Sequence, residues 1–201
     1  IKRIPTVKSL KIKDSAGSLL LGNYDPYTHS YEITATDSSF TVEALPYSEE
    51  YSLSLKAGEN TTVSGQKVEL NGDSGTITVE VEAEGEKNVY TVTLKKVSAV
   101  DVILTMDAGV TAEVLNENGS KIEPKTAGGN VYALVPGAKY HYVGTKEKNY
   151  HTTAEFEAAD QQTVAVAEPE VKQVLTAFAM YDNSSSKNRK AYKWEQEFTP
   201  G

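Results

Sequence analysis

The sequence predicts an all-β protein built from tandem β-sandwiches. Three observations carry this prediction. Apolar and polar residues alternate with a period of two over many short stretches, as half-buried strands require. Gly, Pro, Asn and Asp separate these stretches at regular spacing. No stretch shows the longer period of an amphipathic helix, and a length of 201 residues suits two small domains.

The clearest stretch runs over residues 74–94. Apolar side chains alternate with Thr and Glu on both sides of a short Glu-Gly-Glu-Lys turn. These apolar positions are Ile77, Val79, Val81 and Ala83 before the turn, and Tyr90, Val92 and Leu94 after it. The pattern predicts a β-hairpin with one face buried and the other exposed to solvent.

The residues before this hairpin predict a first domain over 6–97, with a linker over 1–5. Alternation marks five further strand starts, near Val7, Tyr31, Phe40, Tyr51 and Gln66. Proline cannot donate to a strand ladder, so Pro26 lies in a loop with aromatic anchors and Pro46 ends a strand. With the hairpin this gives about seven strands, and an immunoglobulin-like β-sandwich is the simplest fold.

A second, smaller sandwich is predicted over 98–170. Alternation predicts strands that begin near Val100, Val110, Val131, Tyr140, Ala154 and Val164. Turn residues separate them, among them Asn116–Gly119 and Pro136-Gly137. A unit of this size is near the lower limit for a stable core, so we expect contact with the first domain to support it.

The tail, residues 171–201, repeats the opening of the first domain. Leu10–Asp14 aligns with Phe178–Asp182, and Tyr24–Pro26 aligns with Phe198–Pro200. We therefore expect the opening strand and loop of a truncated further domain, in a chain that is a fragment of something longer. Such a piece cannot bury a core alone. We expect its strand to pair with the neighbouring unit, or the polypeptide beyond that strand to be poorly ordered.

Two motifs in the first domain resemble the bacterial cadherin-like β-sandwich domain. One is the aromatic-x-Pro segment with a following tyrosine, here Tyr24, Pro26 and Tyr31. The other is the Ile-x-Val-x-Val strand and the Tyr-x-Val-x-Leu strand of the hairpin described above. The resemblance implies an extracellular multi-domain surface or secreted protein of Gram-positive type. It does not imply calcium, because the region from Lys95 to Asp101 lacks the acidic linker motif of true cadherins.

The second unit is loosely similar to small carboxypeptidase-regulatory and pilin-type sandwiches. The resemblance rests on Pro136-Gly137 before Tyr140 and on the stretch 150–156. Some pilin-type relatives carry a Lys–Asn isopeptide bond between an early and a late strand. Here the early strand, 100–104, has no Lys and the late strand, 163–167, has no Asn, so we expect no such bond.

Composition excludes several functions. The net charge of −8 disfavours nucleic acid and anionic membranes as partners, since both require clustered Lys and Arg. The chain has no cysteine, which excludes disulfides, thiol catalysis and thiolate metal sites. No apolar run is long enough to span a membrane as a helix.

No residues form a recognisable catalytic or cofactor constellation. His29, His141 and His151 lie in separate segments, although His141 and His151 could approach each other across neighbouring strands. A Gly-x-Ser-x-Gly elbow is missing, and the adjacent carboxylates Glu49 and Glu50 suit a wet strand end. We expect no enzyme, no cofactor and no resident metal, and leave open a surface calcium in Asx turns such as Asn71–Asp73.

Tyrosine is the one residue in excess, with 12 Tyr against 4 Phe and one Trp. Aromatic rings stack on sugar faces, so exposed tyrosines are candidate glycan contacts, here Tyr27, Tyr142 and Tyr150. The alternative is a core role, because tyrosine is also a favoured strand residue.

The sequence thus favours a non-catalytic spacer and interaction module of a secreted or cell-surface (cell-wall) bacterial protein. Its partners would be neighbouring domains of a longer chain, and cell-wall or host glycans or surface proteins. Two alternatives stay open: a glycan-binding or adhesin module that uses exposed tyrosines, and accessory domains of an extracellular enzyme whose catalytic domain lies outside this chain.

Overall fold

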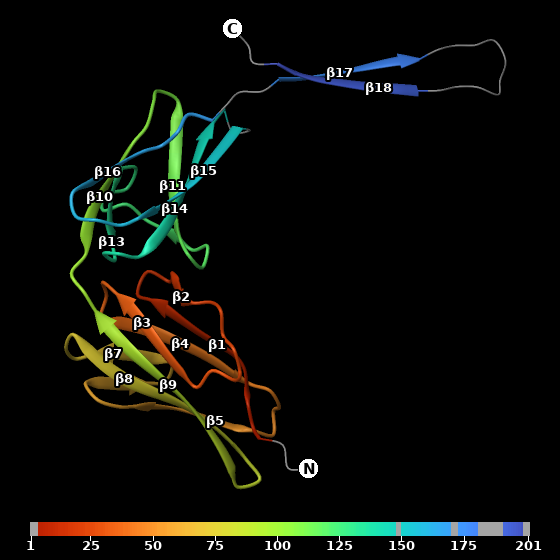
Figure 1. Cartoon of the computed structure of the whole chain (residues 1–201). Helices are drawn as coiled ribbons and strands as arrows, with labels where there is room; N and C mark the ends of the chain where they lie inside the picture. Colours follow the sequence, from red (N-terminus) through yellow and green to blue (C-terminus); the bar gives the residue numbers. More distant parts are fainter. Residues whose placement is uncertain (1–3, 148–149, 170–172, 181–190, 199–201) are drawn as a thin grey trace, which may run out of the picture.

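A computed structural model describes residues 4–147, 150–169, 173–180 and 191–198. Every regular element in these residues is a β-strand, which confirms the all-β prediction (Figure 1). Among them, no helix is long and apolar enough to cross a membrane. Two separate clusters of buried side chains lie along the chain, one in residues 7–94 and one in residues 102–166.

Two sheets face each other in the first sandwich. One has the strand order β2-β1-β4-β7-β6 and the other the order β3-β9-β8-β5. The strands of the first sheet are β1 (Val7–Asp14), β2 (Leu19–Leu21), β4 (Ser39–Pro46), β6 (Thr61–Ser64) and β7 (Lys67–Leu70). Those of the second sheet are β3 (Ser30–Ala35), β5 (Ser52–Ala57), β8 (Ser74–Ala83) and β9 (Glu86–Lys96).

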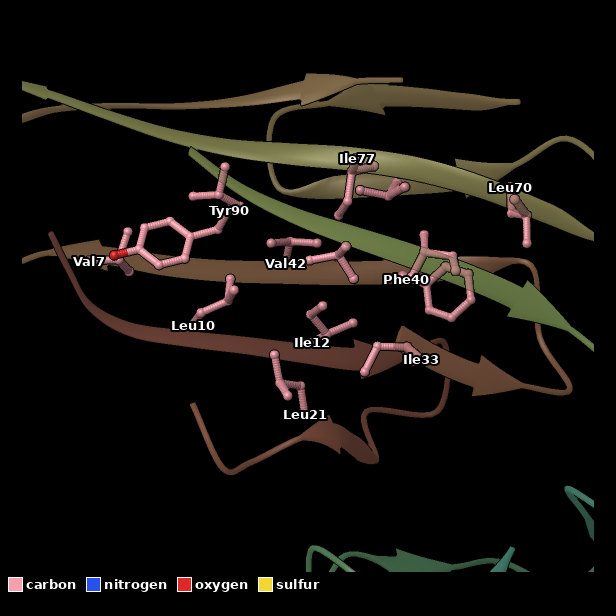
Figure 2. Packing of buried hydrophobic residues seen from close by; sticks show 14 of the residues in the cluster. Val7, Leu10, Ile12, Leu21, Ile33, Phe40, Val42, Leu70, Ile77 and Tyr90 are labelled. Atoms are coloured by element: carbon pink, nitrogen blue, oxygen red, sulfur yellow. The ribbon is translucent and has the colours of Figure 1, made fainter. Parts of the chain in front are cut away.

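The core of this sandwich lies between the two sheets (Figure 2). Both sheets contribute large apolar side chains that are almost fully buried. Leu10, Ile12, Phe40 and Val42 come from the first sheet, and Ile77, Val79, Val81, Tyr90, Val92 and Leu94 come from the second. Burying side chains of this size stabilises the fold by about 1.5–3 kcal/mol each relative to exposure.

The predicted hairpin is confirmed as β8 and β9, whose inward residues alternate as expected. Its turn is tighter than the four residues predicted, because Ala83 already pairs with Glu86. The two residues between them, Glu84 and Gly85, have φ angles of 51° and 76°. Two consecutive positive φ angles are the mark of a type I′ turn, whose twist matches that of the flanking strands.

The first sandwich has more strands than the sequence predicted. The predicted loop between residues 14 and 22 contains the short edge strand β2, and β6 forms a second unexpected edge strand. The register of β1 against β4 shifts between Val7 and Ser9. This bulge places Val7 and Leu10 on the same buried face although they are three residues apart.

The second sandwich also has two facing sheets, with the orders β13-β10-β16 and β12-β11-β14-β15. The strands are β10 (Val100–Thr105), β11 (Val110–Asn116), β12 (Lys121–Ile122), β13 (Val131–Leu134), β14 (Lys139–Lys146), β15 (Tyr150–Glu157) and β16 (Gln162–Ala165). Six lie where the alternation predicts them, and β12 is additional. Val102, Leu104, Val114 and Leu134 are almost completely buried between the two sheets.

The tail forms a two-stranded antiparallel sheet of β17 (Gln173–Met180) and β18 (Ala191–Phe198). The prediction that its strand pairs with the neighbouring sandwich is therefore wrong, since β17 pairs with β18. The segment aligned with the Tyr24–Pro26 loop falls partly on strand β18. Asp182 and Pro200, which the alignment also used, lie outside the described residues.

Candidate functional site

Two hairpin turns of the same design lie at the junction between the sandwiches. In the first, between β1 and β2, the Asp14 N–H donates to Ser18 O and the Gly17 N–H donates to Asp14 O. In the second, between β11 and β12, Asn116, Gly119 and Ser120 make the same pair of bonds. In each turn the side-chain oxygen of the first residue accepts the N–H of the serine, at 2.7 and 2.9 Å. Both glycines have positive φ, at 88° and 74°.

The second turn binds the edge of the first sandwich. Asn118 Nδ2 donates to the carbonyl oxygens of Leu19 at 3.2 Å and Leu20 at 3.0 Å. Asn116 Nδ2 donates to the same Leu19 oxygen at 2.9 Å. In return, the Leu19 N–H donates to Ser120 Oγ at 3.0 Å. These bonds join residues about a hundred positions apart in the chain and connect the two sandwiches directly.

These contacts satisfy an edge strand. β2 is the outermost strand of its sheet, so its outward N–H and C=O groups have no strand partner. Such groups cost free energy when they are buried without a hydrogen-bond partner. When they are exposed to solvent, they can pair with a strand of another chain. Side chains of the second turn take the place of a neighbouring strand. Gly22 lets them approach, because a Cβ at this position would lie 2.7 Å from Asn118 Oδ1.

A hollow of about 310 Å³, lined by both polar and apolar side chains, lies beside these bonds. Residues from both sandwiches line it, among them Asp37 and Glu32 from the first and Lys139 and Tyr140 from the second. Burial by itself raises the pKa of Asp37, but hydrogen bonds from Ser15, Ser38 and Ser39 outweigh it and lower the pKa below its ordinary value. Asp37 is therefore an ionised anchor for two adjacent loops rather than a proton donor.

A cluster of tyrosines fixes the loop between β2 and β3. Tyr24 packs between Tyr31 and Tyr90, with ring centroids 6.2 and 5.8 Å away. Its hydroxyl donates to Val7 O at 2.8 Å, and the Tyr90 hydroxyl donates to Pro26 O at 3.2 Å. Burial is the main cause that raises the pKa values of Tyr24 and Tyr31 above the ordinary range. These rings therefore serve the core and the loop.

Tyr27 and Tyr142, the two candidate glycan contacts whose side chains are described, do not share an exposed face. Tyr27 is 87% exposed, at the tip of the loop that the tyrosine cluster fixes. Tyr142 is only 4% exposed, and its hydroxyl accepts the Ala167 N–H at 3.1 Å. Its expected role as an exposed sugar contact needs correction, because alternation along β14 directs this ring into the second core. The side chain of Tyr150 lies outside the described residues.

The histidines do not form a site. His29 stacks on Tyr90 with ring centroids 5.1 Å apart. In the β14–β15 pair, His141 lies opposite Glu155 and His151 lies opposite Thr145. The approach of His141 and His151 that the sequence left open does not occur, since four positions along a strand separate them by about 13 Å. In the described part of the chain, no group of three or more His, Asp or Glu side chains is placed to hold a metal ion.

Sequence reasoning missed the junction residues Asn116, Asn118 and Ser120. It identified their segment only as a turn. A signal was present, because Asp14–Ser18 and Asn116–Ser120 both read Asx-x-x-Gly-Ser. The matching turns were detectable, but which turn would reach across to β2 was not.

No protein-family model matches the chain, and a search of curated proteins also finds no match. Among solved structures, a chimeric titin Z1Z2 carrying an exogenous peptide from decorin shares 10% identity, with 84% of this chain and 100% of that chain covered and a TM-score of 0.25. A variant of the three-Ig titin fragment I67–I69 shares 10% identity, with 99% and 78% covered and a TM-score of 0.24. The Bacteroides ovatus protein SGBP-B, solved with a mixed-linkage heptasaccharide, shares 11% identity, with 98% and 61% covered and a TM-score of 0.24. At these scores the likenesses add no argument about function, and the immunoglobulin-like sandwich description rests on the sheets themselves.

Proposed function

We propose that this chain is a non-catalytic spacer and interaction module whose two sandwiches are held in a fixed relative orientation. The observation that carries the proposal is the set of bonds from Asn116, Asn118 and Ser120 to the edge strand β2. A flexible tandem would need only the covalent linker between β9 and β10. Here side chains of one unit satisfy the backbone of the other, which restricts bending at the junction.

Small-angle X-ray scattering on the purified chain tests this proposal. A stiff junction gives a scattering curve that one arrangement of the two sandwiches fits, with the tail treated as an appendage. A flexible junction requires a broad ensemble of arrangements, and that result would reject the proposal.

The wider setting is part of the same proposal. We place the module in a secreted or cell-surface (cell-wall) protein of a Gram-positive bacterium, on the resemblance of residues 6–97 to the cadherin-like domain. Neighbouring domains of a longer parent chain would be its first partners. Immunoprecipitation from the cell-wall fraction with an antibody against this chain tests the location, and recovery from the cytoplasm alone would contradict it. If the parent chain also carries a catalytic domain, these sandwiches would be its accessory domains.

A second candidate function is recognition of a glycan or a surface protein by the loop that carries Tyr27. The supporting observation is the contrast between a ring that is 87% exposed and a loop that three other tyrosines hold in place. Because the loop backbone is already held in place, only the side-chain torsions of Tyr27 remain to be ordered when its ring stacks against a sugar. A glycan array and isolated peptidoglycan test it. Binding that is lost in Tyr27→Ala and kept in Tyr47→Ala supports the loop, because Tyr47 is also exposed, at 70%.

A further inference from the structure

The junction contains a dipeptide that can react with itself. Asn118 is followed by Gly119, which has no side chain to obstruct its backbone nitrogen. In such a pair the Gly119 nitrogen can attack Cγ of Asn118. The N–Cγ bond forms, the Cγ–Nδ2 bond breaks, and the departing amide leaves as ammonia with the proton from the Gly119 nitrogen. Water then opens the cyclic imide at either carbonyl, which gives aspartate or isoaspartate at position 118.

The closed junction protects both reacting groups. The leaving nitrogen, Asn118 Nδ2, donates to Leu19 O and Leu20 O. The attacking nitrogen, that of Gly119, donates to Asn116 O at 2.9 Å. Both sets of bonds must be released before the nitrogen can reach Cγ. The reaction therefore requires local opening, while the adjacent hollow, which Asn118 lines, gives water access to this side chain.

Conversion of Asn118 to aspartate would weaken the contact with β2 that protects the asparagine. A carboxylate in place of the amide has no hydrogen to donate, and its oxygen would face two carbonyl oxygens at about 3 Å. We propose that Asn118-Gly119 is a spontaneous modification site that converts the junction from a bonded to a repelling contact. The change is one-way, so the stiffness of the tandem declines with the age of the molecule. This inference rests on the proposed fixed junction.

A second Asn-Gly pair in the same chain serves as the control. Asn71 and Gly72 are both exposed and lie beyond the end of β7. They are close to the linker between the sandwiches, through Asp73, but take no part in the bonds between β2 and the second turn. The full chain is incubated in mildly alkaline buffer, and peptide mapping by mass spectrometry follows conversion at both pairs. We expect conversion at Asn118 to be slower than at Asn71 by about tenfold or more, because opening must come first. In Gly22→Ala, whose added Cβ displaces the Asn118 amide, the rate at Asn118 should approach that at Asn71.

Two results would overturn the inference. One is equal conversion at Asn118 and Asn71 in a chain whose scattering still fits a single arrangement. The other is no conversion at Asn118 in Gly22→Ala after Asn71 has reacted completely. The loosening of the junction is tested separately with Asn118→Asp, whose scattering should require a broad ensemble of arrangements. A scattering curve like that of the wild type would show that a carboxylate at position 118 does not loosen the junction. If the wild type itself scatters as a broad ensemble, the proposed function has failed instead.

Discussion

Removing the Asn118 amide should loosen the contact between the two sandwiches without unfolding either one. Its Nδ2 makes two bonds, to Leu19 O and Leu20 O, and both cross the junction. A net contribution of about 0.5–1.5 kcal/mol for each bond gives about 1–3 kcal/mol for the two. Partial solvent access favours the lower part of this range, so we expect Asn118→Ala to lose about 1–2 kcal/mol. That energy raises the ratio of open to closed junction by about 5- to 30-fold.

The assay is a distance distribution between two spin labels, one on each sandwich. The chain has no native cysteine, so two introduced cysteines label cleanly. Ser54 on β5 and Thr153 on β15 are exposed and lie outside both cores. We expect one narrow distance peak in the labelled parent and a broadened distribution with a new population in Asn118→Ala.

The control removes a comparable bond within one sandwich. Asn130 Nδ2 donates to Leu104 O at 2.8 Å inside the second unit, so Asn130→Ala should lower stability and leave the peak narrow. An Asn118→Ala distribution as narrow as that of the parent would refute the reasoning that these bonds fix the junction. Broadening in Asn130→Ala alone would refute it equally.

Three further predictions concern other positions. Gly22→Ala adds a Cβ that would lie 2.7 Å from Asn118 Oδ1, so it should broaden the same spin-label distribution; an unchanged peak would mean that the Asn118 side chain moves aside at no cost to the junction. Gly85→Ala should lower the free energy of unfolding by about 1–2 kcal/mol, and with it the urea midpoint. The reason is that a φ of 76° is unfavourable for a residue with a side chain, although nothing lies near the new Cβ. In contrast, Glu84→Asn should raise stability by a few tenths of a kcal/mol, since asparagine favours this turn position, and equal midpoints for all three chains would contradict the turn assignment. The pKa of Asp37 is lowered from its ordinary value of 3.8 in the folded chain, so its stabilisation is complete above that pH and is lost as the pH falls through the lower folded value. Asp37→Ala should therefore lower the free energy of unfolding in urea by about 1–2 kcal/mol at neutral pH and by less in acid. An equal loss at both pH values would contradict a stabilising role of the ionised Asp37 carboxylate.

Most of the first sandwich could be predicted from the sequence because period-two alternation directly reflects burial on one face. Ile77, Val79 and Val81 alternate with polar residues and all lie in the core. The bulge in β1 could not be predicted in the same way. It brings Val7 and Leu10 to one face at a spacing that breaks the period, and only the register with β4 reveals it.

Short edge strands were the other omission. β2 has three residues, all leucine, so it offers no alternation to recognise. It pairs on one side with β1, which is next to it in the sequence, and on the other side it is bonded by the turn from Asn116 to Ser120, about a hundred positions away. The candidate site could not be predicted for the same reason. Turn propensity identifies Asn116–Gly119 as a turn, but the atoms that this turn contacts are set by the relative placement of two sandwiches.

Tyrosine shows how composition alone can mislead. The excess of tyrosine suggested a binding face, yet Tyr90, Tyr132, Tyr140 and Tyr142 are all buried. Tyrosine can occupy a core when its hydroxyl finds a partner near the surface, as Tyr142 does with the Ala167 N–H. Of the two candidate contacts whose side chains the structure describes, Tyr27 lies in solvent and Tyr142 lies in the core.

Residual dipolar couplings measured on the full chain test the fixed junction most directly. Amides of residues 4–97 and of 98–169 each report an alignment tensor for their own sandwich. The account predicts that one tensor, of the same magnitude and orientation, fits both sets in the orientation that the Asn118 bonds define. Two tensors of clearly different magnitude would show that the sandwiches reorient independently, and would contradict the account.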